Sequence, residues 1–442
     1  MKRVLILAYD FPPYVSVGGL RPYSWYKYFH EFDLYPIVIT RQWSNKYKGQ
    51  LDYVAPGFSA EAIIEESQFG KIIRTPYFPN LANKIFLKYG EIKFKLIRRF
   101  LSSFYEIFQW LLPVGSKHNI YKYANDFLFH NDVDIIIATG DPFILFKYGT
   151  QLSKKYNLPF IADYRDLWSL NTERKGWLFY KWNKYLECKY IKQSKCIITV
   201  SDFLKNKISE LYNNGPIYII NNGFDLDLIN NINSQSNDAR KLSISLAGTI
   251  YKWHPYDAFL KVINKIYIER RIEIELFFYG INIEHDIRSL INVKYPSIVD
   301  NIHFFPRMEN KQVLQELKKS QLLLLFNYFY FMGTKIFDYL GLKRNILFCF
   351  SDDKDAMSLK NTYYPINEYS NYNDHLQQDL IEKTNSGYII KNTEHLESKL
   401  IELQQEMKNI GEIKCHSLNT IEYSRENQAG LLAEIIKSIC TQ

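Results

Sequence analysis

The sequence predicts an α/β protein built from two doubly wound parallel-sheet domains that face each other across a cleft. Short continuous apolar runs alternate with helix-type patterns along the whole chain. Such runs are typical of parallel strands that helices cover on both faces. At 442 residues the chain is also too long for one ordinary hydrophobic core. These observations together favour two domains over one.

The predicted strands form two sets of about six, one in each half of the chain. Each run is short and apolar, and helical patterns separate the runs. The first set is Val4–Tyr9, Pro36–Thr40, Asp134–Thr139, Pro159–Asp163, Cys196–Val200 and Ile217–Ile220. The second set is Leu242–Ala247, Ile272–Tyr279, Ile302–Phe305, Leu322–Phe326, Ile346–Phe350 and Tyr388–Ile390.

A polar, turn-rich stretch from Asn230 to Asp238 separates the two sets and is typical of a linker. We therefore expect an N-terminal Rossmann-like domain over residues 1–225 and a C-terminal Rossmann-like domain over residues 226–415. A last helical pattern, from about Asn419 to Ile439, predicts a closing helix within residues 416–442.

The composition excludes several classes of protein. Hydrophobic residues make up 47% and charged residues 23% of the chain, as in a folded protein rather than a disordered one. The net charge of +8 suits an anionic substrate or an anionic membrane surface. The sequence has no zinc-ligand spacing, no helix-turn-helix signature and no long basic run. We therefore expect no nucleic-acid partner and no metal site.

The sequence also predicts a compartment. Its five cysteines include no C-x-x-C pair, which favours a reducing environment. The apolar run at the N-terminus ends at Asp10 and is too short for a signal peptide. No apolar run reaches the ~18 residues that a membrane-spanning helix needs. We expect a cytoplasmic protein.

The segment Gly333–Gly341 predicts a phosphate site. It follows the apolar run Leu322–Phe326, begins with Gly333-Thr334 and then becomes helical. Lys335 falls in the first helical turn, where the helix dipole disfavours a cation unless an anion shares the site. The alternative is a solvent-facing lysine that costs a few tenths of a kcal/mol.

Ligands of parallel sheets bind at the carboxyl ends of the strands, so the loops there are the expected location of site residues. In the first half, Gly18-Gly19 allows a close backbone approach, or simply a tight turn. Asp141 can contact a substrate or cap the next helix. Arg165 suits a phosphate or carboxylate, and Asp163 or Asp166 suits sugar hydroxyls or general-base chemistry. The alternative for this cluster is an internal Asp–Arg ion pair that holds the loop.

Three loops of the second half carry similar features. Gly248-Thr249 follows the first strand and permits a close phosphate approach, and Lys252 supplies positive charge nearby. His254 lines the same loop or has only a structural role. Arg307 follows another strand and can stabilise a diphosphate or pair with a nearby acid.

In their order and spacing, five motifs of this chain resemble those of GT-B glycosyltransferases, closest to the family-4-like group. The resemblance runs over nearly the whole chain. The motifs are Tyr9–Pro13 with Gly18-Gly19 and Arg21, Ala162–Ser169, Asn221–Asp225, Leu246–Thr249 and Lys335–Leu340.

The resemblance implies a retaining transfer from a nucleotide-sugar donor, without a metal and without a cofactor. The C-terminal domain would bind the donor and the N-terminal domain the acceptor. Gly333, Thr334 and Lys335 would hold the donor diphosphate, together with Gly248, Thr249 and Arg307. Asp338 falls where the family places the second acid of an E-x7-E pair, usually a contact to the donor ribose.

The resemblance also implies catalytic and acceptor residues. Lys252 would help to neutralise the leaving group. Arg165, with Asp166 beside it, falls near the position where many relatives carry a histidine that faces the sugar. The acceptor set is Gly18, Gly19, Arg21, Asp141 and Asp163.

The chain departs from the family at two points. Tyr330 stands eight positions before Asp338, where the pair's first glutamate is expected. Lys252 does not reproduce the usual arginine-plus-lysine spacing.

The expected function is sugar transfer to a glycan or a polyprenyl-linked acceptor in surface polysaccharide biosynthesis. The alternatives are a GT-B sugar-nucleotide epimerase and a non-catalytic GT-B binding subunit of a transferase complex.

A basic amphipathic helix is predicted between about residues 95 and 111. Its apolar residues recur at helical spacing, and basic residues precede or flank them. This pattern favours peripheral contact with an anionic membrane, at the inner face of the plasma membrane. The alternative is a helix that packs on the N-terminal sheet. The apolar residues are Ile97, Phe100, Leu101, Phe104, Ile107, Phe108 and Leu111, and the basic ones are Lys84, Lys88, Lys93, Lys95, Arg98 and Arg99.

Overall fold

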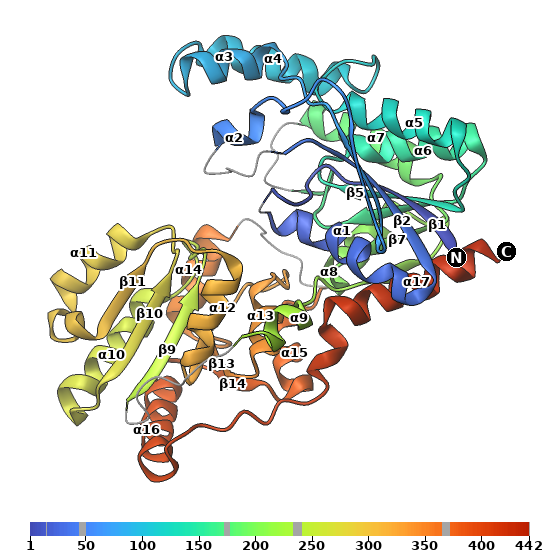
Figure 1. Cartoon of the computed structure of the whole chain (residues 1–442). Coiled ribbons are helices and arrows are strands. Elements are labelled where there is room, and N and C mark those ends of the chain that lie inside the picture. Colours follow the sequence, from blue (N-terminus) through green and yellow to red (C-terminus); the bar gives the residue numbers. More distant parts are fainter. Residues whose placement is uncertain (15, 44–49, 172–176, 233–240, 365–371, 442) are drawn as a thin grey trace. The chain divides into compact units, whose positions relative to one another are not determined.

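The computed structural model describes residues 1–14, 16–43, 50–171, 177–232, 241–364 and 372–441, and it divides into two compact units (Figure 1). Unit 1 comprises Met1–Asn221 and Glu426–Gln442, and unit 2 comprises Asn222–Arg425. The chain therefore leaves unit 1 after Asn221, before the expected boundary at 225, and returns at Glu426 rather than at 416. The predicted linker lies mostly outside the described residues.

Unit 1 contains an eight-stranded sheet in the order β3-β4-β2-β1-β5-β6-β7-β8 within the described residues. Its strands pair in parallel, except that β3 runs antiparallel to β4. The strand order reverses between β1 and β5, which is where ligands bind in open parallel sheets. The strands are β1 (Lys2–Leu7), β2 (Leu34–Arg41), β3 (Ile63–Ser67), β4 (Gly70–Thr75), β5 (Ile135–Gly140), β6 (Phe160–Tyr164), β7 (Cys196–Thr199) and β8 (Ile217–Ile219).

Helices pack on both faces of this sheet. The C-terminal helix is one of them, because its residues Leu432, Ala433 and Ile436 share a buried core with Val4 of β1 and Trp25. Figure 1 shows this red helix beside α1 and the N-terminus. The helices of unit 1 are α1 (Val17–Tyr28), α2 (Gln50–Val54), α3 (Leu81–Tyr89), α4 (Lys95–Phe108), α5 (His118–His130), α6 (Ile144–Tyr156), α7 (Trp177–Ile191), α8 (Asp202–Ser209) and α17 (Arg425–Cys440), with a 3-10 turn at Phe29–Phe32.

Unit 2 contains a fully parallel sheet in the order β11-β10-β9-β12-β13-β14. Its strand order reverses between β9 and β12, so the loops after these two strands meet at the usual ligand-binding point. The strands are β9 (Leu242–Ala247), β10 (Ile274–Tyr279), β11 (Ile302–Phe305), β12 (Leu322–Phe326), β13 (Asn345–Cys349) and β14 (Gly387–Ile390).

Both faces of the unit 2 sheet are covered, which is why β12 is an unbroken apolar run. Leu322, Leu324 and Phe326 belong to one buried cluster, and Leu323 and Leu325 belong to another. Successive side chains of a strand point to opposite faces, so the run supplies both cores. The helices are α9 (Leu226–Asn230), α10 (Tyr256–Arg270), α11 (Glu284–Lys294), α12 (Asn310–Lys319), α13 (Lys335–Leu342), α14 (Lys354–Tyr363), α15 (Leu376–Thr384) and α16 (Thr393–Ile410), with 3-10 turns at Pro296–Asn301 and Thr420–Tyr423.

The structure confirms two parallel-sheet domains and corrects one detail of the N-terminal half. The strands β3 and β4 were not predicted. β3 is mostly exposed, and its Ile63-Ile64 is followed by two glutamates, so the sequence shows no continuous apolar run there. None of the helices that the structure describes is both long and apolar enough to cross a bilayer.

Candidate functional site

The residues around Lys335 come together at the point in unit 2 where the strand order reverses. Gly333, at φ +66°, and Thr334 lead from the loop after β12 into α13, which starts at Lys335. The Lys335 ammonium donates a hydrogen bond to the Thr249 carbonyl at 2.8 Å. A Cβ on Gly248 would lie 3.1 Å from the Lys335 Cε, so the missing side chain leaves room for the lysine. Five residues of the predicted donor set therefore meet here.

Lys335 carries a charge that the surrounding protein does not balance. Among the described residues it forms no ion pair, and the bond that it makes is to a carbonyl. Desolvation lowers the pKa of Lys335 to about 8. A partly desolvated cation at a helix start is costly unless an anion joins it, which is the arrangement of a phosphate site.

Two ring N–H donors lie on the same loop as Thr249. The buried His254 ring accepts a hydrogen bond from the Tyr251 backbone N–H at Nδ1, at 3.3 Å, so the neutral ring carries its proton on Nε2. Burial lowers the pKa of His254 well below its usual value, and Lys335 lowers it further. Within the described residues neither His254 Nε2 nor Trp253 Nε1 has a hydrogen-bond partner. Nδ1 of His254 is therefore structural, while Nε2 and the Trp253 indole are buried donors that no described residue satisfies.

Aromatic rings line this part of unit 2. The Tyr251 and Trp253 rings stack with centroids 4.4 Å apart at 7°, and Tyr251 stacks on Tyr328 at 5.2 Å and 11°. Tyr328 belongs to the loop after β12, so the stack joins the loops that follow the two central strands. Flat rings of this kind hold the loops in place and offer a surface to a planar ligand.

Three other predicted residues of unit 2 lie outside this group of contacts. Lys252 is exposed, and Lys335 rather than Lys252 lies against Gly248. Arg307 is exposed in the loop after β11, two strands away from β9. Asp338 has Arg425 and Asp225 as its electrostatic neighbours. Burial raises the pKa of Asp338 to about 6, Arg425 lowers it, and Asp225 raises it.

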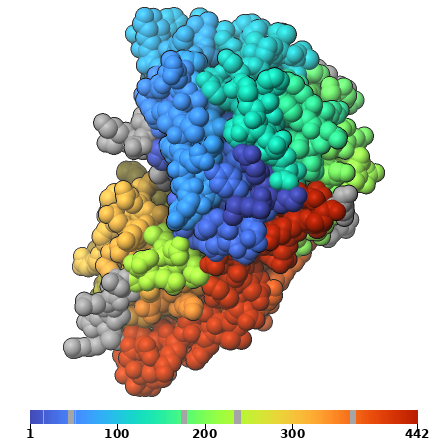
Figure 2. Space-filling view, turned by 45° about the vertical axis from the view of Figure 1, so that its right-hand side comes forward, coloured from blue at the N-terminus to red at the C-terminus, as the bar shows by residue number. Residues whose placement is uncertain are grey.

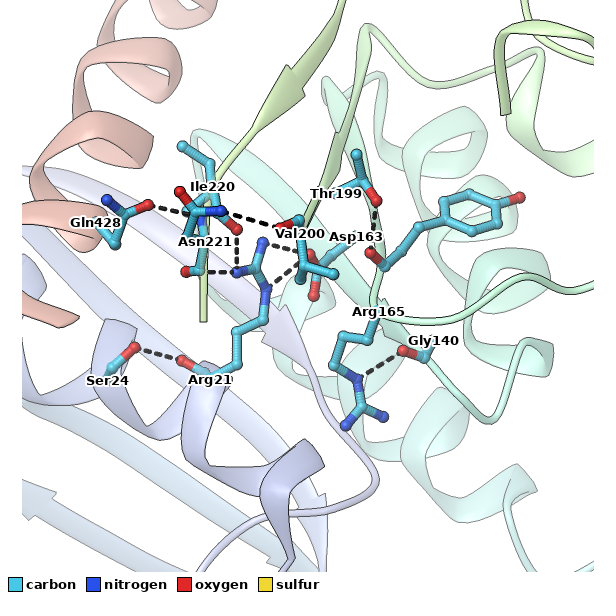
Figure 3. A network of polar contacts seen from close by, with 11 residues as sticks. Arg21, Ser24, Gly140, Asp163, Arg165, Thr199, Val200, Ile220, Asn221 and Gln428 are labelled. Carbon is cyan, nitrogen blue, oxygen red and sulfur yellow. Dashed lines mark hydrogen bonds and ion pairs between the residues drawn. The ribbon is translucent and has the colours of Figure 1, made fainter. Parts of the chain in front are cut away.

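In unit 1, Arg165 joins the carboxyl ends of three neighbouring strands. Its Nε donates to the Gly140 carbonyl at 2.7 Å (Figure 3), and its Nη2 donates to the Asp141 carbonyl at 2.7 Å. A side chain on Gly18 would overlap the guanidinium. Gly18, Asp141 and Arg165 thus gather at the ends of β1, β5 and β6, while the exposed Asp166 follows Arg165 in the same loop.

Asp10, which follows β1, belongs to this group, although sequence reasoning did not select it. Its Oδ2 accepts a hydrogen bond from the Ser16 hydroxyl at 3.0 Å, and its Oδ1 is buried without a partner among the described residues. Burial raises the pKa of Asp10, and Arg165 opposes that rise. The available signal was a carboxylate directly after the first strand of a parallel sheet.

Arg21 and Asp163, both predicted to bind the acceptor, form a buried ion pair that holds unit 1 together. Asp163 Oδ1 lies 2.9 Å from both Nε and Nη2 of Arg21, and the side chains are 2% and 0% exposed. Arg21 Nη1 donates to the Ile220 carbonyl at 2.6 Å and to the Asn221 carbonyl at 3.2 Å (Figure 3). The pair therefore ties α1 and β6 to the last residues before the chain leaves unit 1.

Gly19 is also placed inside the fold. It is buried in α1, and its N–H donates to the Ser16 hydroxyl at 3.0 Å, which caps the helix. A Cβ there would lie 3.1 Å from the Phe11 backbone nitrogen. The close approach that this glycine permits is to the chain itself.

Comparison with known proteins agrees with the fold. Residues 50–228 match the family model described as Glycosyltransferase Family 4, while no curated protein matches the chain. Similar solved structures include sucrose-phosphate synthase from Thermosynechococcus elongatus, at TM-score 0.56 and 13% identity over 99% of each chain. The catalytic domain of starch synthase IV from Arabidopsis thaliana, bound to ADP and acarbose, gives 0.54 and 11% over 100% of both chains. HepE from Anabaena, in complex with UDP-glucose, gives 0.51 and 11% over 100% of this chain and 98% of that one.

This chain has the GT-B fold of glycosyltransferases, with a family-4-like N-terminal unit. The prediction of the fold is confirmed, and the match over residues 50–228 agrees with the resemblance to the family-4-like group. The assignment of single residues to donor, acceptor or catalytic roles stays a prediction for this GT-B protein. Among the described residues no group of three or more His, Cys, Asp or Glu side chains is arranged to hold a metal ion.

Tyr330, which the resemblance places at the position of the pair's first acid, is buried in this GT-B protein. Its ring lies 6.3 Å from that of Tyr364, and the Lys360 ammonium lies 5.6 Å from the Tyr330 ring centroid. The side chain therefore packs within unit 2 and brings no negative charge to the loop after β12.

Gln377 of α15 secures that loop. Its Oε1 accepts from the Tyr328 backbone N–H at 2.9 Å, and its Nε2 donates to the Met332 carbonyl at 2.9 Å. The side chain is buried and comes from an element about 45 residues further along the chain. Nothing in the local sequence identified it.

Replacing Gln377 with leucine is expected to destabilise unit 2 by about 1–3 kcal/mol, because two buried backbone groups lose their partners. The loop that precedes Lys335 would then lose its anchor, and nucleotide affinity should fall with it. Thermal melting and calorimetric titration with a nucleoside diphosphate measure the two effects. Gln378→Leu is the matched control, since this side chain bonds the exposed Glu382, and equal losses in both variants would argue against the assignment.

Proposed function

We propose that this protein is a retaining, metal-independent glycosyltransferase that moves a sugar from a nucleotide-sugar donor to a glycan or polyprenyl-linked acceptor. Unit 2 would bind the donor and unit 1 the acceptor. The proposed setting is surface polysaccharide biosynthesis in the cytoplasm, at the inner face of the plasma membrane. Retention, metal independence and the acceptor class are inferred from the family resemblance, and the donor site has direct support in unit 2.

The observation that carries the proposal is the unbalanced Lys335 ammonium at the start of α13. It is partly desolvated, lies against Gly248, and has two unpartnered N–H donors on the Gly248–His254 loop. A diphosphate offers the acceptor oxygens and the negative charge that this arrangement lacks. HepE and starch synthase IV have the same fold, and their structures hold UDP-glucose and ADP, which supports a nucleotide for this site.

The reaction exchanges one bond at the anomeric carbon for another. The bond from that carbon to the diphosphate oxygen breaks and its electron pair stays on the diphosphate. A bond to the acceptor oxygen forms, and the proton of the acceptor hydroxyl passes to the leaving diphosphate. Negative charge grows on the leaving diphosphate, where a fixed ammonium stabilises the transition state more than the ground state. In unit 1, the Asp10 carboxylate beside Arg165 suits hydroxyl recognition on the acceptor side.

A non-catalytic binding subunit is the second candidate, and Tyr330 is the observation in its favour. The buried ring stands where the family resemblance places an acid on the donor side. A protein that kept the fold and lost this acid could serve an active partner.

Stabilisation by one nucleotide is the first expected result. A ligand that binds only the folded state raises the melting temperature by mass action. UDP, GDP, CMP and ADP are titrated against wild type and Lys335→Ala, and the variant should bind about 1–3 kcal/mol more weakly. Unchanged affinity in Lys335→Ala would refute the phosphate site.

Turnover separates the remaining functions once a nucleotide is found. Transfer requires donor and acceptor together, whereas an epimerase converts the donor alone. A binding subunit gives no turnover until its partner is added. Analysis of the anomeric configuration of the product by NMR tests retention, and activity that survives excess chelator tests metal independence.

A further inference from the structure

The helices α3 and α4 present an apolar surface that nothing in the described structure covers. No residue of α4 is buried, so the alternative that this helix packs on the N-terminal sheet is wrong. Figure 1 shows α3 and α4 side by side at one end of unit 1, and Figure 2 shows their light-blue atoms on its surface. Leu96 and Phe100 are 79% and 72% exposed.

The exposed apolar residues of α4 follow a helical stripe. They recur at three- and four-residue spacing and therefore share one face, while Lys95, Arg99 and Glu106 fall on the opposite face. Turn and helix-end residues extend the stripe. The exposed members are Ile92, Phe94, Leu96, Ile97, Phe100, Phe104, Ile107, Leu111 and Leu112.

Positive charge surrounds this stripe. Residues 81–112 contain six basic residues and two acidic ones, Glu91 and Glu106, and so carry a charge of +4, which is half of the chain's +8. Within the hairpin that α3 and α4 form, the Arg98 guanidinium of α4 lies 4.7 Å from the ring centroid of Phe86 in α3. The other basic residues, Lys84, Lys88, Lys93, Lys95 and Arg99, are exposed.

We propose that the α3–α4 hairpin docks unit 1 onto an anionic lipid bilayer. The exposed Phe, Leu and Ile side chains would enter the boundary between headgroups and acyl chains, and the flanking lysines and Arg99 would lie at the level of the lipid phosphates. Charge favours a bilayer over a second copy of this hairpin as the partner of the surface. Two hairpins that each carry a charge of +4 would repel each other. An anionic bilayer complements the apolar stripe and the basic border at once.

The anionic bilayer would be the membrane partner of the proposed transferase. Docking itself does not depend on the proposed function, but the biological purpose of docking rests on it. A lipid-linked acceptor would lie within reach of a docked enzyme. The test below uses neither donor nor acceptor, so its failure would leave the proposed transferase reaction standing, and failure of that reaction would leave the docking surface standing.

Flotation of the full-length protein with vesicles tests the proposal. We expect binding to phosphatidylcholine vesicles that contain phosphatidylglycerol, little binding to phosphatidylcholine alone, and release at about 1 M salt. Phe100→Ser/Phe104→Ser should weaken binding about tenfold or more. Lys93→Gln/Lys95→Gln/Arg99→Gln should do the same through charge.

Matched controls come from the same unit. Phe129 of α5 is 73% exposed, and Phe129→Ser should bind as wild type does. Lys122→Gln/Lys154→Gln/Lys192→Gln removes three exposed charges elsewhere on unit 1. Leu111→Ser/Leu112→Ser replaces the phenylalanine variant if that one melts early.

Two results would overturn the proposal. One is equal flotation of wild type and a folded stripe variant. The other is that wild type sediments as a dimer in sedimentation velocity and the stripe variant as a monomer, because a second copy of the chain would then cover the apolar stripe.

Discussion

Replacing Asp163 with alanine is expected to lower the free energy of unfolding of unit 1 by about 3–5 kcal/mol, the usual cost of breaking a buried ion pair by removing one partner. The Asp163 carboxylate is fully buried, and Arg21, 2% exposed, has no route to water. Without Asp163, the Arg21 guanidinium keeps the Ile220 and Asn221 carbonyls but loses its counter-charge. A buried and unpaired charge is far more costly than a lost surface contact.

Urea denaturation followed by tryptophan fluorescence measures this loss. Six of the seven tryptophans lie before Asn222, in unit 1, so the signal reports mainly on that unit. Glu66→Ala is the control, because the Glu66–Lys71 pair at 3.1 Å has a 58% exposed carboxylate and solvent screens it, so its loss should be much smaller. Equal losses in the two variants would contradict the structural role. Asp163→Asn keeps the volume and one acceptor oxygen, so its loss should be smaller.

The partner of Asp163 illustrates what sequence reasoning could not reach. Local spacing placed Asp163 and Arg165 together and suggested an ion pair between neighbours. The structure pairs Asp163 with Arg21, 142 positions away, because the sheet order brings α1 beside β6. Arg165 instead crosses to the end of β5. Which acid meets which base depends on strand order, and apolar periodicity does not specify that order.

The local arrangement around Lys335 was more predictable, because its signals lie close together in the sequence. A strand, a glycine, a helix start and a cation follow one another between Leu322 and Lys335, and backbone preferences alone favour that arrangement. The choice between Lys335 and Lys252 as the cation beside Gly248 needed the structure. So did Gln377, whose role depends on α15 lying under the loop after β12.

The helix α4 shows a further limit of predicting structure from apolar patterning. An amphipathic stripe predicts a helix, but it does not say whether protein or another apolar phase covers the stripe. The basic border favoured a membrane surface, and the exposure of the stripe in the structure removes packing on the sheet as the competing explanation.

The affinity of unit 2 for a nucleoside diphosphate is expected to fall about tenfold between pH 7 and pH 9, because Lys335 loses its proton in this range. Desolvation lowers the pKa of Lys335 to about 8, so the side chain is mostly charged at pH 7 and mostly neutral at pH 9. The terminal phosphate is already ionised above its second pKa of about 6 and adds little to the change. Only the ammonium form supplies charge to the diphosphate, and the neutral amine leaves that charge unbalanced.

Calorimetric titration at pH 7, 8 and 9 measures this dependence with whichever nucleotide stabilises the protein. A bound anion raises the pKa of Lys335, so binding near pH 8 should take up protons. Buffers of different ionisation enthalpy report that uptake directly. An unchanged dissociation constant across the range would show that Lys335 does not contact the phosphate.

Lys335→Arg isolates the titrating group. A guanidinium keeps its proton throughout, so the affinity of this variant should stay flat from pH 7 to pH 9, even if its absolute value changes. Lys311→Gln removes an exposed lysine from α12 and should retain the wild-type slope. Because the arginine variant preserves charge while removing the titration, a wild-type slope in Lys335→Arg would assign the pH dependence to another group.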